Sequence, residues 1–156
     1  MIESSILEAF KSIEEEDFFM KAKIFAASGH NTVECLLLET KEVQTLINAP
    51  QKALPLLEIR MKDQDISDQV KIVCVVTLAK FGSLQAAKIL IEFIESLPDE
   101  IGEEANHITH PYGYAVRALR RITKDEELFE VSQSQITQRL RIIQHVQDWL
   151  EKKEKN

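Results

Sequence analysis

The chain has 156 residues and a net charge of −7, and 44% of its residues are hydrophobic. This length and composition fit one domain with its own core and argue against a disordered chain. They also argue against a membrane protein, because no apolar run approaches the roughly 18 residues of a membrane span. The N-terminus is acidic and amphipathic, unlike a signal peptide, so we expect a cytoplasmic protein.

The negative charge is concentrated in residues 1–116, whereas residues 117–156 are slightly basic. An acidic surface argues against general nucleic-acid binding, which depends on neutralising phosphates. It is compatible with a basic protein partner, and it is also what solubility alone requires.

The first part of the chain predicts three helices. Apolar residues at helical spacing indicate helices over 3–15 and 17–28, and Gly29 is expected to end the second. Asn31 is a favourable cap for a third helix, which extends to about residue 47. Its apolar pattern weakens at 39–44, so this helix is either kinked or made of two pieces.

A fourth helix is expected over 51–62, followed by a fifth over 68–82. Asp65 or Ser67 can cap this fifth helix, and Gly82 can end it. We expect it to be buried on most sides. One face is formed by Val70, Val73, Cys74, Thr77, Leu78 and Phe81, and Val75, Val76 and Ala79 widen it.

Ser83 is expected to cap a sixth helix over 84–97, which Pro98 ends, and Pro111 to begin a seventh. Residues 98–110 between them are the longest non-periodic stretch. A long last helix follows Ser134. Its inward-facing residues are predicted to be Ile136, Leu140, Ile143, Val146, Trp149 and Leu150. Cys35 and Cys74 both fall within apolar helical patterns, so we expect reduced thiols in the core.

Two helix pairs can be aligned with each other. The fourth helix matches the sixth at a shift of 33 residues, which pairs Ala53 with Ala86. The fifth matches the seventh at a shift of 41, which pairs Leu78 with Leu119. The second shift exceeds the first by eight residues (41 against 33), which places an insertion at 98–110. In helical arrays such insertions often lie on the binding face.

A two-helix unit of this length resembles HEAT or armadillo-type repeats. The second helix of a HEAT unit usually has an Asp, then Val-Arg, small residues, Leu and a closing Gly. In this chain the corresponding residues are Asp68, Val70, Lys71, Leu78 and Gly82, and Val116-Arg117-Ala118-Leu119 is a partial match. Lys71 stands where the family prefers Arg, and Thr123 replaces the second Gly.

The resemblance implies an all-α fold, an α-α superhelix of about three to four antiparallel helix pairs in a right-handed array. The best-matched units are 50–82 and 83–123, with a capping helix over 134–153, in one domain. The alternative is an irregular helical bundle.

Two charged features are candidates for partner binding. The stretch 98–110 carries four acids and no Lys or Arg, and Arg117, Arg120, Arg121 and Lys124 form one basic stripe. The stripe can bind an acidic partner or phosphate, or it can pair internally with the acidic loop or with residues 125–127; we favour internal pairing. The predicted partner-binding residues are Asp99, Glu100, Glu103, Glu104, His107, Tyr112, Arg117 and Arg121.

No nucleophile with its base and no glycine-rich phosphate loop is present, so we do not expect an enzyme or a cofactor. The residual case is a metal-dependent hydrolase using His107 and His110, which lack a third ligand at suitable spacing. We expect a protein-binding module with a basic partner. One specific version is an immunity protein that neutralises a basic toxin; the alternative is an adaptor or chaperone-like subunit of a larger complex.

Overall fold

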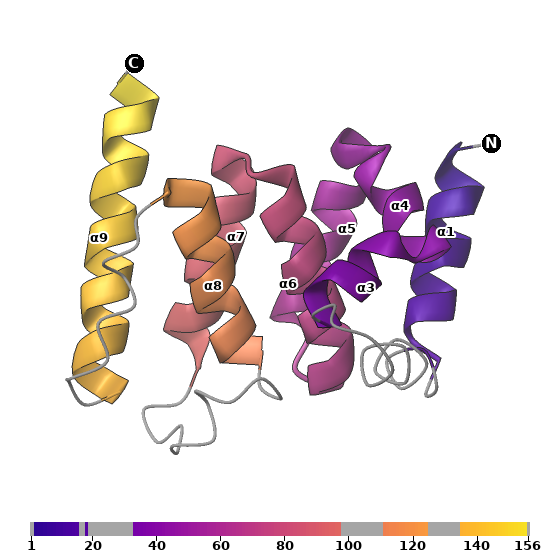
Figure 1. Ribbon diagram of the computed structural model, residues 1–156, viewed down its shortest axis with the longest axis horizontal. Helices are drawn as coiled ribbons and strands as arrows, with labels where there is room; N and C mark the ends of the chain where they lie inside the picture. Colours follow the sequence, from indigo (N-terminus) through magenta and orange to yellow (C-terminus); the bar gives the residue numbers. More distant parts are fainter. Residues whose placement is uncertain (1, 16–17, 19–32, 98–110, 125–134, 156) are drawn as a thin grey trace.

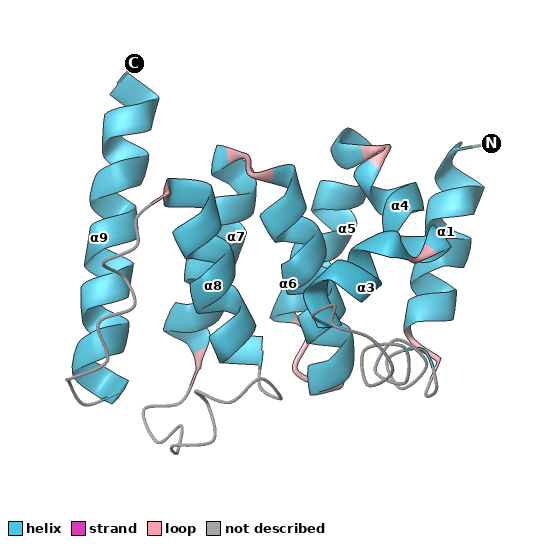
Figure 2. Ribbon diagram, viewed as in Figure 1, coloured by secondary structure: helices cyan, strands magenta, loops and turns pink. Residues whose placement is uncertain are grey.

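The computed structural model describes residues 2–15, 18, 33–97, 111–124 and 135–155, and this part of the chain is all-α, as predicted (Figures 1 and 2). The expected helix over 17–28 lies almost entirely outside the described residues. The helices are α1 (Ile2–Ile13), α3 (Val33–Glu39), α4 (Lys41–Ile47), α5 (Pro50–Lys62), α6 (Asp68–Phe81), α7 (Leu84–Ser96), α8 (Pro111–Thr123) and α9 (Gln135–Lys155).

The helices form two layers (Figure 1). Helices α5 and α7 lie side by side in one layer, and α4, α6 and α8 lie in the other. At one end of the array α1 packs mainly against α4, and at the other end α9 packs against α7 and α8. The short helix α3 contacts α4 and α6. Helix α6, in the middle, makes its most extensive contact with α8.

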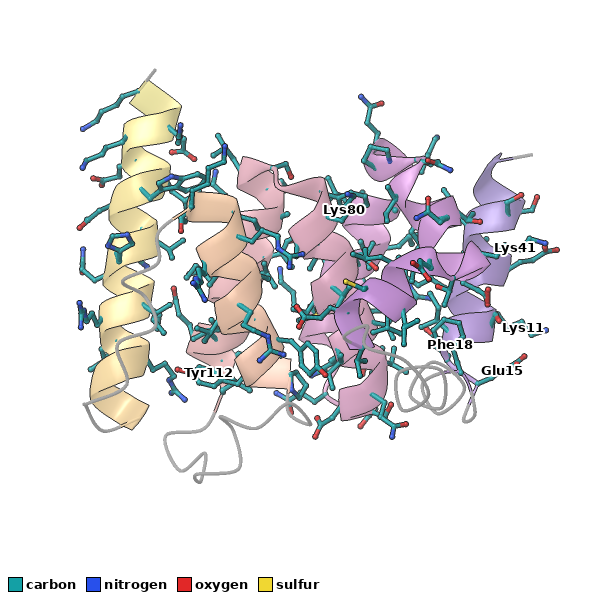
Figure 3. The ribbon with its side chains drawn as sticks, in the orientation of Figure 1. Lys11, Glu15, Phe18, Lys41, Lys80 and Tyr112 are labelled. Atoms are coloured by element: carbon teal, nitrogen blue, oxygen red, sulfur yellow. The ribbon has the colours of Figure 1, made fainter. Side chains whose placement is uncertain are left out.

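Short connections give the array two distinct edges (Figure 1). We call the side with the α5–α6 turn (63–67), the end of α7 and the start of α8 the lower edge. The upper edge holds the α6–α7 turn and the ends of α6, α8 and α9. Figure 3 shows Lys80 near the upper edge and Tyr112 near the lower one.

Helix α6 is the centre of the core, as its sequence predicted. Ile72 to Leu78 are all buried, and Leu78 is 0% exposed. The Ser67 hydroxyl accepts a hydrogen bond from the Val70 N–H at 3.3 Å, which caps the first turn. Gly82 ends the helix in the left-handed region at φ 62°, where L side chains are disfavoured.

Several residues paired by the two alignments are buried in both helix pairs, although Leu54 and Leu56 are only partly buried where Ala87 and Ile89 are buried. Ala53 and Ala86 are both 0% exposed, and so are Leu78 and Leu119. Leu57 and Leu90, also paired, are both 0% exposed. The same positions therefore face the core in both helix pairs, while a HEAT-type superhelix stays a prediction.

Three local expectations were resolved or corrected by the structure. The third predicted helix is two pieces, because the Thr40 hydroxyl caps α4 by accepting from the Val43 N–H at 3.3 Å. Cys74 is buried, but Cys35 is exposed, since Leu37 faces the core instead. Residues two apart on a helix point about 200° apart, so they cannot share one face.

The same separation of residues two apart explains why the predicted inward face of α9 was partly wrong. Leu140 was predicted to face inward but is 63% exposed, whereas Ile142 is 1% exposed. Val146 and Leu150 follow Ile142 at intervals of four residues and are buried with it. The inward stripe of α9 therefore runs through Ile142, Val146 and Leu150. None of the described helices combines the length and apolar character needed to cross a membrane.

Candidate protein-binding edge

The α5–α6 turn exposes three carboxylates at the lower edge: Asp63, Asp65 and Asp68. The Asp63 carboxylate accepts a hydrogen bond from the Asp65 N–H at 2.9 Å, which shapes the turn. Asp68 lies in the first turn of α6, where a negative charge is favoured by the helix dipole. Asp63 and Asp68 therefore each have a local structural role in the turn. Asp65 has no such role, and its side chain is exposed to solvent.

The connector between α7 and α8 joins two points of this same edge. It begins after Leu97 and ends at Pro111. In the sequence it contains Asp99, Glu100, Glu103, Glu104 and His107, all of which lie outside the described residues. The structure thus places the ends of the predicted acidic loop on the edge that already exposes the acidic turn.

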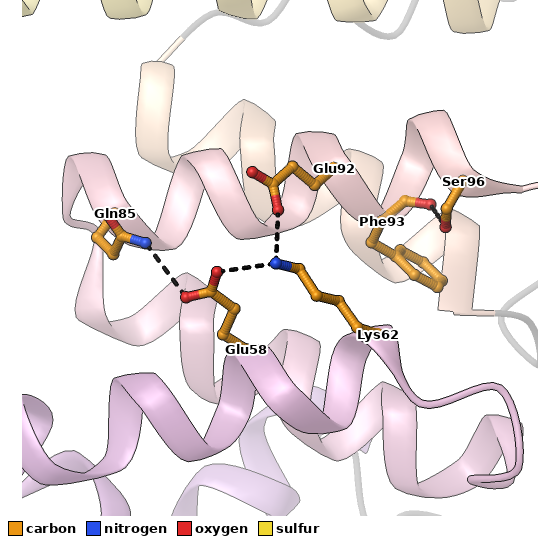
Figure 4. A network of polar contacts seen from close by, with 6 residues as sticks. All are labelled: Glu58, Lys62, Gln85, Glu92, Phe93 and Ser96. Carbon is orange, nitrogen blue, oxygen red and sulfur yellow. Dashed lines mark hydrogen bonds and ion pairs between the residues drawn. The ribbon is translucent and has the colours of Figure 1, made fainter.

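Lys62, the last residue of α5, is held by two carboxylates (Figure 4). Its ammonium lies 3.1 Å from Glu58 on the preceding turn and 3.5 Å from Glu92 on α7. The Gln85 amide donates to the other Glu58 oxygen at 3.5 Å. The hydrogen bond to Glu58, followed by the attraction of Glu58 and Glu92, raises the pKa of Lys62. This cation is therefore already neutralised within the chain.

A pocket of about 190 Å³ opens next to Lys62, between the end of α5, the first turns of α6 and the end of α7. Its floor is apolar, because Met61, Ile89 and Phe93 are each no more than 4% exposed. Its rim includes Lys62, Glu92, Ser96 and Lys71. The Lys71 ammonium lies 5.5 Å from the centroid of the Phe93 ring.

A second, more open hollow of about 400 Å³ lies between α1 and α4. The Ser12 hydroxyl donates to Glu42 at 3.2 Å across it. Lys41 and Glu8 also line the hollow. Acidic and basic groups are thus mixed here, and the hollow has no charge preference comparable to the lower edge.

Arg117, a predicted site residue, is tied into the fold. Its Nε lies 3.1 Å from Glu34 of α3, and its guanidinium lies 4.5 Å from the centroid of the Tyr114 ring. Internal pairing was expected for this stripe, but with the acidic loop or residues 125–127 as partners. The observed partner is instead Glu34, in the first turn of α3.

Tyr112 and Arg121 lie at opposite ends of α8. Tyr112 is 2% exposed, and burial raises the pKa of its hydroxyl while Arg139 acts in the opposite direction. Arg121 is exposed in the last turn, at the upper edge. They are nine positions apart at about 1.5 Å per residue, so their backbones are separated by roughly 13 Å along the helix. The structure does not bring these two predicted site residues to one surface.

The lower edge contains residues that sequence reasoning missed. Neither the turn 63–67 nor Lys62 or Lys71 was among the predicted site residues, because nothing in a single sequence indicates that Lys62 meets Glu92 or that Lys71 lies over Phe93. His107 and His110 lie outside the described residues, and no group of three metal-ligand side chains occurs in the part that is described. No family model, no curated protein and no solved structure matches this chain, so its function is inferred from its own contacts and charges.

Proposed function

We propose that the protein is a non-enzymatic protein-binding module whose lower edge binds a basic surface of its partner. The observation that carries the proposal is the exposed acidic turn with Asp63, Asp65 and Asp68, located where the acidic connector 98–110 begins and ends. Charges of one sign on one edge attract an oppositely charged protein and orient it during approach.

The nearest cation on this edge does not offset these acids. Lys62 pairs with Glu58 and Glu92, so its positive charge does not compensate the carboxylates of the α5–α6 turn. The remaining carboxylates repel one another across a solvated surface, and a basic partner relieves that repulsion. Because exposed charges are screened by salt within about 8 Å at physiological ionic strength, association is expected to be fastest in dilute buffer.

One specific version of this function is an immunity protein that neutralises a basic toxin in the cytoplasm. Small size and an acidic binding edge support it. An adaptor or chaperone-like subunit uses the same edge on a different partner. We propose in addition that the two layers belong to a HEAT-type α-α superhelix, which the shared burial of aligned residues supports.

The test changes the charge of the lower edge while preserving the hydrogen bond that shapes the α5–α6 turn. Asp63→Asn retains the oxygen that accepts from the Asp65 N–H, and Asp65→Lys reverses a carboxylate that caps nothing. The matched control is Asp148→Asn with Glu151→Lys on α9, since Asp148 likewise only accepts a bond, from Gln144 at 3.0 Å. Both pairs change the net charge by the same amount.

Each protein is used to capture partners from the cells that produce it, and association rates of the captured partner are measured at several salt concentrations. We expect the edge variant to associate about ten times more slowly at low salt, with the control unchanged. Equal rates for the edge variant and the wild type would show that the lower edge is not the binding surface. Capture of a partner with a strongly acidic surface would also contradict the proposal.

A further inference from the structure

The pocket on the lower edge differs in charge from the turn beside it. Two ammonium groups, those of Lys62 and Lys71, line it with one carboxylate, that of Glu92. Glu92 and Glu58 are both committed to Lys62, at 3.5 and 3.1 Å. Lys71 forms no ion pair with any carboxylate in the described part of the chain and only faces the Phe93 ring. Lys71 is therefore the ammonium of this pocket that no carboxylate of the described residues pairs with, because both nearby carboxylates are engaged by Lys62.

From this juxtaposition we infer that the pocket receives the side-chain carboxylate of an Asp or Glu on the partner protein, with Lys71 as its counter-ion. The inference rests on the proposed function and specifies the partner more closely. The partner's surface would have Lys or Arg side chains that contact the acidic turn, and among them one Asp or Glu whose carboxylate enters the pocket. A partner Lys or Arg is unsuited to this position, because Lys71 would repel it.

The size and lining of the pocket agree with such a ligand. A volume of about 190 Å³ corresponds to roughly six water molecules at 30 Å³ each, enough for the end of one side chain. Met61, Ile89 and Phe93 form an apolar floor for the methylene groups. An apolar floor also lowers the local dielectric, which strengthens an ion pair made above it. The half-buried Lys71 is preordered by its ring contact.

The experiment uses the full chain and two synthetic peptides that differ at one position. Both are acetylated and amidated, with two Lys residues at each end and Gly spacers; one has Glu at its centre and the other has Gln. Binding is followed through backbone amide signals by NMR at low salt. We expect the Glu peptide to bind at least about five times more tightly and to shift the signals of Lys71 and Phe93.

Lys71→Met should remove the preference for the Glu peptide over the Gln peptide, and Lys71→Arg should retain it. Lys80→Met is the matched control: Lys80 is an exposed lysine on the same helix, at the opposite edge, and its loss should not change the ratio. Thermal melts of all three variants identify any that fail to fold; if Lys71→Met is one of them, the preference of the wild type for the Glu peptide and the shifts of the Lys71 and Phe93 signals still test the pocket.

The outcomes separate the two proposals. If both peptides bind equally well, or if the preference for Glu survives in Lys71→Met, the pocket is not a carboxylate site, while the acidic edge stands. If neither peptide binds, the acidic edge and the pocket are both rejected.

Discussion

The Nε atom of Arg117 lies 3.1 Å from the Glu34 carboxylate and joins α8 to α3 across 83 residues of sequence. The two side chains are 29% and 19% exposed, so the pair is only partly shielded from water. Its geometry explains how a helix as short as α3, with seven residues, is fixed against the array. An isolated helix of this length is not stable in water.

Breaking this pair should destabilise the protein modestly. We expect Glu34→Gln and Arg117→Gln each to lower the free energy of unfolding by about 1 kcal/mol, with a coupling of about 0.5–1 kcal/mol in the double mutant. Urea denaturation of the four proteins measures the coupling. Additive single effects would show that the contact contributes nothing to stability.

Truncation in the centre of α6 should be far more costly. Leu78 is 0% exposed, so Leu78→Ala is expected to lower the free energy of unfolding by about 2–5 kcal/mol. Ile59→Ala is the control, because Ile59 is 62% exposed and its truncation should cost less than about 0.5 kcal/mol. Similar midpoints for both variants in denaturant melts would contradict a core position for Leu78.

The two cysteines should react very differently. Burial raises the pKa of the Cys74 thiol from 9.0 to about 12, whereas Cys35 is exposed. A thiol reagent at pH 8 should therefore modify one cysteine quickly in the native protein and two after denaturation. The Cys35→Ser variant retains Cys74 as its one thiol. Any fast reaction of this folded variant with the reagent would therefore show that Cys74 is accessible.

The same shift makes stability depend on alkaline pH. The folded protein holds the Cys74 proton more tightly than the unfolded chain does, so this group contributes stability below pH 9. That contribution should be lost progressively as the pH rises from about 9 towards 12. The measurement is the difference in unfolding free energy between the wild type and Cys74→Ala at pH 7 and pH 10. A constant difference would contradict the prediction.

Charge reversal in the connector distinguishes binding from internal pairing. With Arg117 already engaged by Glu34, we expect Glu103→Lys with Glu104→Lys to leave the melting temperature nearly unchanged. The association rate with the captured partner should fall, most strongly at low salt. A clear drop in melting temperature would instead indicate that these acids are neutralised by the chain's own cations.

Local signals in the sequence were sufficient for much of the fold. The cap at Ser67, the left-handed Gly82 and the apolar run between them define α6 completely, because each acts through neighbouring residues. The inward face of α9 was misjudged at Leu140, since the pattern permits more than one stripe and the packing against α7 and α8 selects it. The contacts of Lys62 and Arg117 could not be predicted, because they depend on how helices distant in sequence approach each other.

The burial of residues 72–78 of α6 has a consequence for the newly made chain. Helix α8, which makes the most extensive contact with α6, is completed 42 residues after α6 ends (123 − 81). At a synthesis rate of about 5–20 residues per second, the ribosome takes roughly 2–8 s to make that stretch. During this interval α6 has been made but lacks its main cover, so its buried residues reach their final packing only after α8 has been added.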